Sequence, residues 1–364
     1  MTVAKKVHLK SILKHLILDP DGFTPEHAAD GLHSIMRGEA SDAQIGGFLT
    51  ALRLRGMDKD PQMIASLATE VYKHALRPTL ETSEKNREQF GMVVDIVGTG
   101  GDGWNTFNIS TTSSLVAAAA GLQVAKHGSR ASSSNCGSAD LLESLGCDLG
   151  IISPSDVAEL LSEHCFCFLF SSTFHPSMRY LAKTRRELGF PTPFNVLGPL
   201  TNPVVPDRAV IGVHSKSLGP VMAEALKILG RRNYAVVCGD ENLDEISIAG
   251  NTHVWHIQEG GEVKNYTIHP NDFGVSTHPL SEAAGSTLEE NKATLKRLIS
   301  NKLEAKDEPI RDFVLINTGF LLYISGLAAS MKEGADIARK TLESGKVQDL
   351  LERFSKATQS FKDA

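Results

Sequence analysis

The sequence has few cysteines, no long apolar run and no excess of positive charge. Its 364 residues include five cysteines and no CxxC pair, so neither a disulfide framework nor a zinc site is expected, and we predict a reducing, cytoplasmic location. No segment approaches the roughly 18 consecutive apolar residues of a membrane span. Lys plus Arg number 37 against 43 for Asp plus Glu, a net charge of −6. We therefore expect neither a membrane nor a nucleic acid as a partner.

The chain is long enough for about two domains at roughly 150 residues each. From residue 7 to about residue 76, apolar positions recur at helical spacing. Three of the predicted helices have capping residues at their starts, namely Thr24-Pro25, Ser41 with Gln44, and Asp60-Pro61. The pattern predicts a small helical domain over residues 1–82, and we expect helices near residues 175–190 to join it.

After a polar linker at residues 77–89, the pattern changes to short apolar runs that alternate with helical stretches. The strand-like runs are residues 92–97, 124–125, 166–170, 209–213 and 235–237. This alternation is typical of an α/β domain with a largely parallel sheet, here residues 90–364. Residues 252–268 alternate polar and apolar side chains around two glycines, which predicts a hairpin.

A glycine-rich turn follows the first predicted strand. Residues 98–103 read GTGGDG, and a turn without side chains exposes backbone N–H groups that can surround a phosphate. No Gly-Lys-Ser/Thr follows, so this is not a Walker loop. The GxGxxG spacing is present, but Trp104 to Asn108 delay the helix, and Lys126-His127 stand where a dinucleotide site would have an acid. We therefore disfavour an NAD enzyme.

The residues after this turn suit a phosphorylated sugar better. Thr106, Asn108, Ser110 and Thr111 place hydroxyl and amide groups at the start of the next helix, where unpaired N–H groups and the positive dipole end also point. Ordinary helix capping explains one of these residues, but not all four together with the glycine turn.

A second polar loop, residues 126–138, lies between a predicted strand and a predicted helix. Its two cations and five serines suit a polyanion such as pyrophosphate, although such a loop in isolation is usually a solvated surface. Asp244-Glu245 follows a further strand and fits Mg²⁺, which takes one or two carboxylates together with substrate oxygens. Adjacent acids on a loop are also often merely solvated.

Taken together, these segments resemble the anthranilate phosphoribosyltransferase family. The resemblance rests on the segments GEASDAQIGGFLTALRLRG, VGTGGDGWNTFNIST, KHGSRASSSNCGSADLLESLG, HPSMRYLAKTRRELG, FNVLGPLTNP and LDEIS, which span nearly the whole chain. It implies a nucleoside phosphorylase/phosphoribosyltransferase-like fold and a homodimer. It also implies transfer of the phosphoribosyl group of 5-phosphoribosyl 1-pyrophosphate to the amine of anthranilate, with release of pyrophosphate, in tryptophan biosynthesis.

The resemblance also implies roles for individual residues. Gly98 would contact anthranilate through its backbone, Arg185 would hold the anthranilate carboxylate, and Ser110, Asp244 and Glu245 would place Mg²⁺. The residues implied to bind the sugar donor are Gly101, Asp102, Thr106, Asn108, Ile109, Ser110, Thr111, Lys126, Gly128, Ser129, Arg130, Ser133, Ser134 and Ser138.

Two positions depart from the family pattern. Ser129 stands where many members have a longer Asn that contacts substrate, and Pro191-Thr192 stands where Arg-Thr is common. Lys126, His127 and Arg185 are the candidate catalytic residues; His127 either takes a proton or only donates and accepts hydrogen bonds, and we favour the second.

Two other classes remain open at this point. One is a pyrimidine nucleoside phosphorylase-like enzyme, which also acts at the ribose C1 atom, although its turn usually reads like GGVGD. The other is a non-catalytic binding protein on the same fold.

Overall fold

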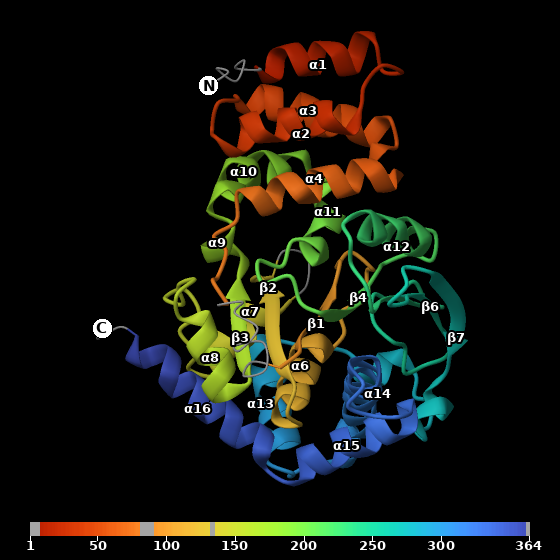
Figure 1. The fold of residues 1–364 in the computed structure, drawn as a ribbon. Helices are drawn as coiled ribbons and strands as arrows, with labels where there is room; N and C mark the ends of the chain where they lie inside the picture. Colours follow the sequence, from red (N-terminus) through yellow and green to blue (C-terminus); the bar gives the residue numbers. More distant parts are fainter. Residues whose placement is uncertain (1–7, 81–90, 132–134, 362–364) are drawn as a thin grey trace.

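The computed structural model describes residues 8–80, 91–131 and 135–361. Four helices form a bundle at one end of the molecule (Figure 1): α1 (Leu9–Leu18), α2 (Pro25–Met36), α3 (Asp42–Leu54) and α4 (Pro61–Lys73). The predicted helix starts agree with the structure, because Thr24, Ser41 and Asp60 each accept a hydrogen bond from a first-turn N–H group.

A single seven-stranded sheet, in the order β3-β2-β1-β4-β5-β6-β7, forms the centre of the larger part. The first five strands are parallel and β6 and β7 add an antiparallel hairpin, so the expectation of a largely parallel sheet is confirmed. The strands are β1 (Val93–Gly98), β2 (Gln123–Gly128), β3 (Phe166–Phe170), β4 (Arg208–Gly212), β5 (Tyr234–Gly239), β6 (Thr252–Ile257) and β7 (Val263–Ile268).

The strand order reverses direction between β1 and β4. The chain runs outward through β2 and β3 on one side, returns to β4, and then continues through β5 on the other side. In open parallel sheets, ligands bind in the crevice at the carboxyl ends of the strands beside such a switch point. Gly98 and Gly212 are paired neighbours at these two carboxyl ends.

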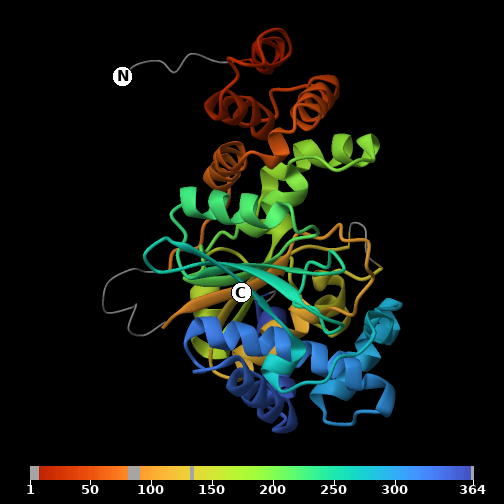
Figure 2. The same cartoon turned by 90° about the vertical axis from the view of Figure 1, so that its right-hand side faces the viewer.

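Helices cover both faces of the sheet (Figure 2). Alternate residues of β5 face opposite cores, as the pleat requires. Ala235 and Val237 belong to one core, whereas Val236 and Cys238 belong to a second core that continues into the N-terminal bundle.

The helices that cover the two faces of the sheet are α6 (Ile109–Ala119), α7 (Ser138–Ser144), α8 (Val157–His164), α12 (Leu218–Ile228), α13 (Leu288–Ile299), α14 (Glu308–Ser325), α15 (Met331–Glu343) and α16 (Lys346–Ser360).

The connection from β3 to β4 leaves the sheet and reaches the bundle. It contains α9 (Ser171–Phe174), α10 (Arg179–Leu188) and α11 (Phe194–Leu197), and α10 packs against α2 and α3. Leu181, fully buried on α10, shares the core of the bundle. The domain limits at residues 82 and 90, and the assignment of residues near 175–190 to the helical domain, stay predictions; residues 81–90 lie outside the described part.

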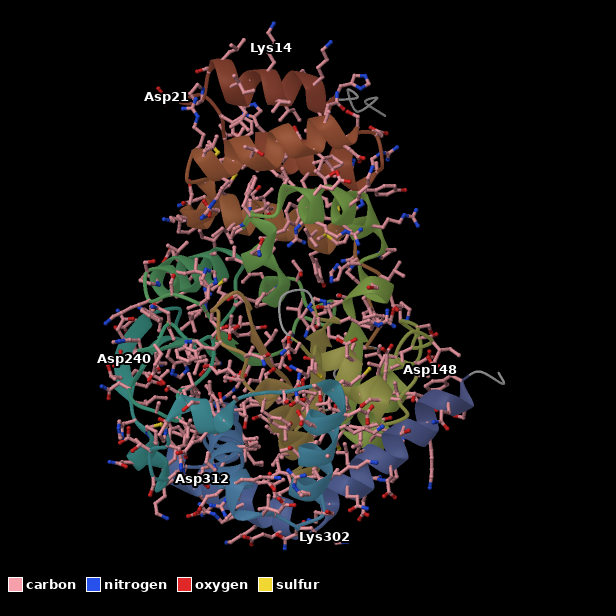
Figure 3. All side chains as sticks on the ribbon, turned by 180° about the vertical axis from the view of Figure 1, so that it is seen from behind. Lys14, Asp21, Asp148, Asp240, Lys302 and Asp312 are labelled. Atoms are coloured by element: carbon pink, nitrogen blue, oxygen red, sulfur yellow. The ribbon has the colours of Figure 1, made fainter. Side chains whose placement is uncertain are left out.

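The C-terminal helix α16 is fixed to the sheet domain by two polar contacts. The backbone N–H of Asp148 donates to the Thr358 hydroxyl oxygen at 3.0 Å, and the Gln359 amide donates to the Gly146 carbonyl at 2.7 Å. Figure 3 shows Asp148 beside this helix. In the part of the chain that the structure describes, no helix is both long and apolar enough to cross a membrane.

Candidate active site

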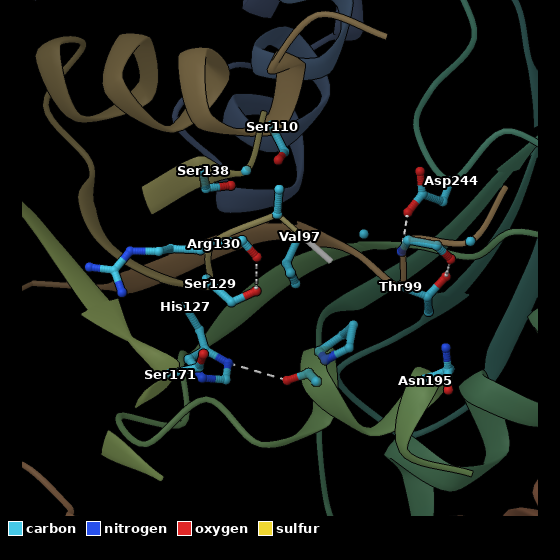
Figure 4. A pocket seen from close by; sticks show the side chains of 18 of the residues that line it. Val97, Thr99, Ser110, His127, Ser129, Arg130, Ser138, Ser171, Asn195 and Asp244 are labelled. Atoms are coloured by element: carbon cyan, nitrogen blue, oxygen red, sulfur yellow. Dashed lines mark hydrogen bonds between the residues drawn. The ribbon is translucent and has the colours of Figure 1, made fainter. Parts of the chain in front are cut away.

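A cavity of about 1020 Å³ opens at the switch point, between the carboxyl ends of the strands and the helical bundle (Figure 4). It brings together residues from the glycine turn, the second polar loop, the acidic loop and α10. The sequence-predicted residues that line it are Gly98, Gly101, Asp102, Thr106, Asn108, Ile109, Ser110, Lys126, His127, Gly128, Ser129, Arg130, Ser138, Arg185, Asp244 and Glu245.

Thr111 is the one predicted residue of the described part that does not line the cavity. Thr111 is fully buried on α6, with its hydroxyl enclosed in the protein, so its side chain does not reach the cavity. Ser133 and Ser134 lie outside the described residues.

The glycine turn has the backbone that its sequence requires. Gly100, Gly101 and Gly103 have φ values of 69°, 82° and 80°, a region that other residues rarely adopt. The Gly100 N–H donates to an Asp244 carboxylate oxygen at 2.6 Å, as Figure 4 shows. The turn therefore holds the acidic loop by its backbone.

The acidic loop approaches the sheet very closely. A Cβ atom on Gly98 would overlap the Asp244 carboxylate, and one on Gly212 would overlap the Asp244 backbone. The two neighbouring strand ends thus need glycine so that Asp244 can lie over them.

Asp244 and Glu245 line the cavity beside Asp102, and two adjacent carboxylates suit a divalent cation. The Asp244 backbone N–H donates to Asp102 at 3.4 Å, and the Thr106 hydroxyl donates to Glu245 at 3.5 Å. Burial and the charge of Asp102 raise the pKa of Asp244 to about 7. Burial and the charges of Asp244 and Asp102 raise the pKa of Glu245 well above its usual value. A hard cation relieves such repulsion, and oxygen-only ligands suit Mg²⁺.

A buried lysine lies beside this group. Lys126 on β2 is 1% exposed, and its ammonium donates to the Ile96 carbonyl at 2.8 Å and the Ser110 hydroxyl at 3.3 Å. Burial lowers its pKa, which the charges of Asp95 and Glu245 partly offset. Ser110 is in the first turn of α6, so the ammonium and the positive end of the helix act on the same region. An anion is favoured there.

Asp95 is a buried acid near Lys126 that the sequence analysis did not single out. It is buried on β1, and burial raises its pKa to about 6. The Asn202 amide donates to Asp95 and to the Ala125 carbonyl, both at 2.9 Å, which ties β1 to β2 next to Lys126. The sequence did contain a signal for this buried pair, namely an acid within the apolar run VVDIVG and a lysine within QVAKHG.

The second polar loop is held by its own contacts. The Arg130 guanidinium binds Glu143 through two bonds of 2.7 and 3.1 Å and lies over the Phe170 ring, so it points away from the acidic group (Figure 4). The Ser129 hydroxyl donates to the Arg130 carbonyl at 3.0 Å. Arg130 is therefore less available to a ligand than the sequence suggested, whereas the loop backbone and Ser138 line the cavity.

The opposite wall carries a second positive group. Arg185 on α10 is half-buried, its guanidinium carbon lies 5.6 Å from the centre of the Phe194 ring, and no carboxylate among the described residues offsets the burial that lowers its pKa. An unpaired guanidinium beside an aromatic ring suits a planar carboxylate ligand.

Two histidines lie between the walls. The His127 and His175 rings are 5.0 Å apart. His127 Nδ1 lies 3.2 Å from the Gly198 carbonyl, which assigns the proton to Nδ1, and Nε2 has no partner among the described residues. Burial lowers the pKa of His127 to about 3 and that of His175 to about 4, so both are neutral at pH 7. His175 and Asn195 line the cavity and were not among the predicted residues.

Comparisons with known proteins agree with this arrangement. Residues 10–75 match the helical bundle domain of a glycosyl transferase family, and residues 91–348 match its α/β domain. An anthranilate phosphoribosyltransferase from Schizosaccharomyces pombe is 42% identical, with 92% of each chain covered. The match is therefore almost full-length.

Two solved structures from Saccharomyces cerevisiae superpose closely. One, anthranilate phosphoribosyltransferase in complex with PRPP and Mg, is 36% identical with a TM-score of 0.88 over 97% of this chain and 98% of that one. The other, in complex with 4-fluoroanthranilate, is 34% identical with a TM-score of 0.87 over 98% and 99%. The two domain matches define a glycosyl transferase of two-domain build. Within that class, the chain belongs to the anthranilate phosphoribosyltransferase family.

The buried neutral state of His127 predicts an acid-dependent loss of stability. An unfolded histidine has a pKa of about 6.5, so between about 6.5 and the value of about 3 only the unfolded chain binds this proton. The free energy of unfolding that neutral His127 contributes is fully present above pH 6.5 and is lost as the pH falls toward 3. From about pH 7 to about pH 4.5, native protein should lose about 2 kcal/mol more unfolding free energy than His127→Gln, measured by urea denaturation.

His8→Gln, at an exposed position, is the control and should follow the native curve. Burial raises the pKa of Asp95, so its effect on stability has the opposite pH dependence. Asp95 is present in all three proteins, and its effect therefore cancels when their unfolding free energies are compared. Parallel curves for native protein and His127→Gln would contradict the assignment.

Proposed function

We propose that this protein transfers the 5-phosphoribosyl group of 5-phosphoribosyl 1-pyrophosphate to the amine of anthranilate, forming N-(5-phosphoribosyl)anthranilate and pyrophosphate in tryptophan biosynthesis. The observation that carries the proposal is one cavity with two unlike ends. One end combines three carboxylates, the α6 N-terminus and Lys126, and the other presents Arg185 without an acidic partner. A phosphorylated donor with a metal suits the first end, and a carboxylate-bearing acceptor suits the second.

The donor would lie along the glycine turn and the start of α6. The binding residues we propose are Gly101, Asp102, Thr106, Asn108, Ile109, Ser110, Lys126, Gly128, Ser129, Arg130 and Ser138, together with Ser133 and Ser134 from the undescribed segment. Arg130 would act mainly by fixing the loop, because Glu143 already occupies its guanidinium. The solved relative with PRPP and Mg supports a donor of this kind.

Asp244, Glu245 and the Ser110 hydroxyl would hold Mg²⁺, with Asp102 beside them. When bound, Mg²⁺ supplies positive charge that stabilises negative charge on the departing pyrophosphate. The chain's own part is to keep these oxygens in place, through the Gly100 N–H on Asp244 and the Thr106 hydroxyl on Glu245.

Arg185 would hold the anthranilate carboxylate while the Gly98 backbone contacts its ring. The relative with 4-fluoroanthranilate supports an acceptor of this shape. His127 is neutral, and a pKa of about 3 makes it a weak proton acceptor at pH 7. We propose that its free Nε2 accepts a hydrogen bond from the acceptor amine and orients it, as favoured from the sequence.

Catalysis would then rest on position and charge. The bond from the ribose C1 atom to the pyrophosphate oxygen breaks as the bond from C1 to the amine nitrogen forms, and the proton that the amine loses passes to the released pyrophosphate or to water. Lys126 and the first turn of α6 stabilise negative charge on the leaving group without moving. Arg185 and the glycine turn hold the two reactants in line. No covalent intermediate with the protein is needed.

Two further features extend the proposal. Large apolar side chains are exposed on the outer helices of the bundle, with Ile17 55%, Leu18 69% and Leu54 82% accessible, which supports a homodimer formed through residues 1–82. The larger catalytic domain would be residues 90–364. Among the described residues the cysteines form no disulfide, in line with the reducing cytoplasm that we propose.

A direct assay tests the function. We expect loss of anthranilate fluorescence when the protein is mixed with 5-phosphoribosyl 1-pyrophosphate and Mg²⁺, and no cleavage of thymidine by inorganic phosphate. The second arm addresses the pyrimidine nucleoside phosphorylase alternative, which the comparisons do not favour. Thymidine cleavage without anthranilate turnover would refute the proposal.

The metal assignment predicts a large loss of turnover. Asp244→Asn combined with Glu245→Gln should lower kcat by at least about a hundredfold, because metal stabilisation of a leaving group is worth several kcal/mol. Asp240→Asn is the matched control, since Asp240 lies on the same loop but binds His253 at 2.7 Å. Steady-state rates over a range of Mg²⁺ concentrations check this, and near-normal kcat in the double variant would remove the two acids from the mechanism.

The acceptor assignment predicts a selective change in KM. Arg185→Ala should raise the KM for anthranilate by more than about tenfold, the worth of a charged hydrogen-bonded contact, while the KM for the donor changes little. Arg186→Ala, at an exposed neighbouring position, should change neither. Equal increases for both substrates would show that Arg185 acts on the fold of the cavity rather than on anthranilate.

A further inference from the structure

The helical bundle carries a compact group of nitrogen and oxygen donors away from the cavity. His33 lies in the last turn of α2, Glu70 lies in the last turn of α4, and His74 caps the end of α4. His33 Nδ1 is 2.7 Å from Glu70 Oε1, His74 Nε2 is 3.2 Å from the same oxygen, and the two nitrogens are 3.1 Å apart. The three atoms form a nearly equilateral triangle.

This triangle has the size of one face of a metal coordination shell. With ligand bonds of about 2.1 Å, two donors of a tetrahedral Zn²⁺ are about 3.4 Å apart. Glu70 and His74 are four residues apart on one helix, a spacing that places two ligands on one face, and His33 comes from the neighbouring helix. The group is reachable from solvent, since the His33 side chain is 50% exposed while Glu70 is 4% exposed.

The three atoms can be held by hydrogen bonds or by a metal, depending on the tautomers of the two rings. When each ring carries its proton on the nitrogen of this triangle, both N–H groups donate to Glu70 Oε1, at 2.7 and 3.2 Å. A neutral imidazole can instead carry the proton on its other nitrogen. In that tautomer both rings direct a lone pair into the triangle without losing a proton, and two nitrogens and one carboxylate oxygen then face a cation.

The charged neighbours of this group leave one oxygen of Glu70 for a cation. Lys73 donates to Oε2 of Glu70 at 3.0 Å, so Oε1 faces the histidines, while the ammonium charge weakens the attraction of the carboxylate for a metal. Arg37 is bound to Glu39 at 3.0 Å, and its charge also acts on His74. The site is also close to two helix carboxyl ends, where the backbone dipoles attract positive charge.

We propose that His33, Glu70 and His74 form a structural site for a divalent cation of the Zn²⁺ class, separate from the Mg²⁺ group of the cavity. Two imidazoles and one carboxylate suit Zn²⁺ or Co²⁺, whereas Mg²⁺ prefers an all-oxygen shell. The ion would join the end of α2 to the end of α4. From there the chain continues to Leu76, whose N–H donates to the Phe174 carbonyl of the sheet domain at 2.8 Å. Bound metal thus stabilises the segment that connects bundle and sheet.

Zinc titration of the full-length, chelator-treated protein in saturating Mg²⁺ tests the site. We expect one tight Zn²⁺ per chain by calorimetry, a visible absorption band with Co²⁺ typical of a nitrogen-containing four-coordinate shell, and a rise in Tm of several degrees with Zn²⁺, as expected when a ligand binds only the folded state. Native protein that takes up no Zn²⁺ would overturn the proposal.

Three variants locate the binding. His33→Ala combined with His74→Ala should weaken Zn²⁺ binding by at least about a hundredfold and abolish the Tm shift. His278→Ala is the matched control, because His278 makes a single histidine–carboxylate pair with Asp312 at 3.0 Å, and it should bind Zn²⁺ like native protein. Unchanged binding in the double variant would place the metal elsewhere and refute the site.

The third variant gains affinity, so misfolding cannot imitate its result. Lys73→Met removes the ammonium that competes for Glu70 and should tighten Zn²⁺ binding several-fold. Unchanged or weaker binding in Lys73→Met, with the native circular dichroism spectrum, would contradict the role of Glu70 as a ligand.

Discussion

The close approach of Asp244 to the ends of β1 and β4 is the constraint on which the cavity depends. A side chain on Gly98 or Gly212 would occupy the space of Asp244, so these paired positions must be glycine. Once Asp244 lies there, the Gly100 N–H fixes its carboxylate and Glu245 is brought over the start of α6. The topological switch point supplies the crevice, and the missing side chains allow carboxylates to reach its floor.

Several charged side chains are buried in the same region. Their burial is unfavourable without a ligand, but it strengthens their interaction with a charged ligand. Lys126, Asp95 and Glu245 are enclosed together, and burial shifts the pKa of each toward its neutral form. A bound cation would neutralise the charge of Glu245, and a polyanionic ligand would neutralise that of Lys126. Asn202 holds Asp95 against β2, and charged groups that are held in place in this way are the condition for electrostatic stabilisation of a leaving group.

The sequence predicted local features well because their causes are local. The capping residues Thr24 and Ser41 and the glycine turn needed only neighbouring residues to be interpreted. Contacts across the fold could not be predicted in this way. Arg130 looked free in sequence because its partner Glu143 is on the following helix, and Thr111 looked accessible because a helix start does not show which side is covered. The donors around Glu70 were missed because His33 is 37 positions away.

The bundle positions the end of the cavity that contains Arg185. Arg185 belongs to the β3–β4 connection, and α10 is positioned by its packing on α2 and α3 rather than by the sheet. Val71 of α4 also lines the cavity, one residue from Glu70. The Lys126 end of the cavity is fixed by strands and the Arg185 end by helices, so the distance between the two ends depends on how bundle and sheet are held together. A metal joining α2 to the end of α4 would act on that connection, because α4 leads directly into the segment bonded to Phe174.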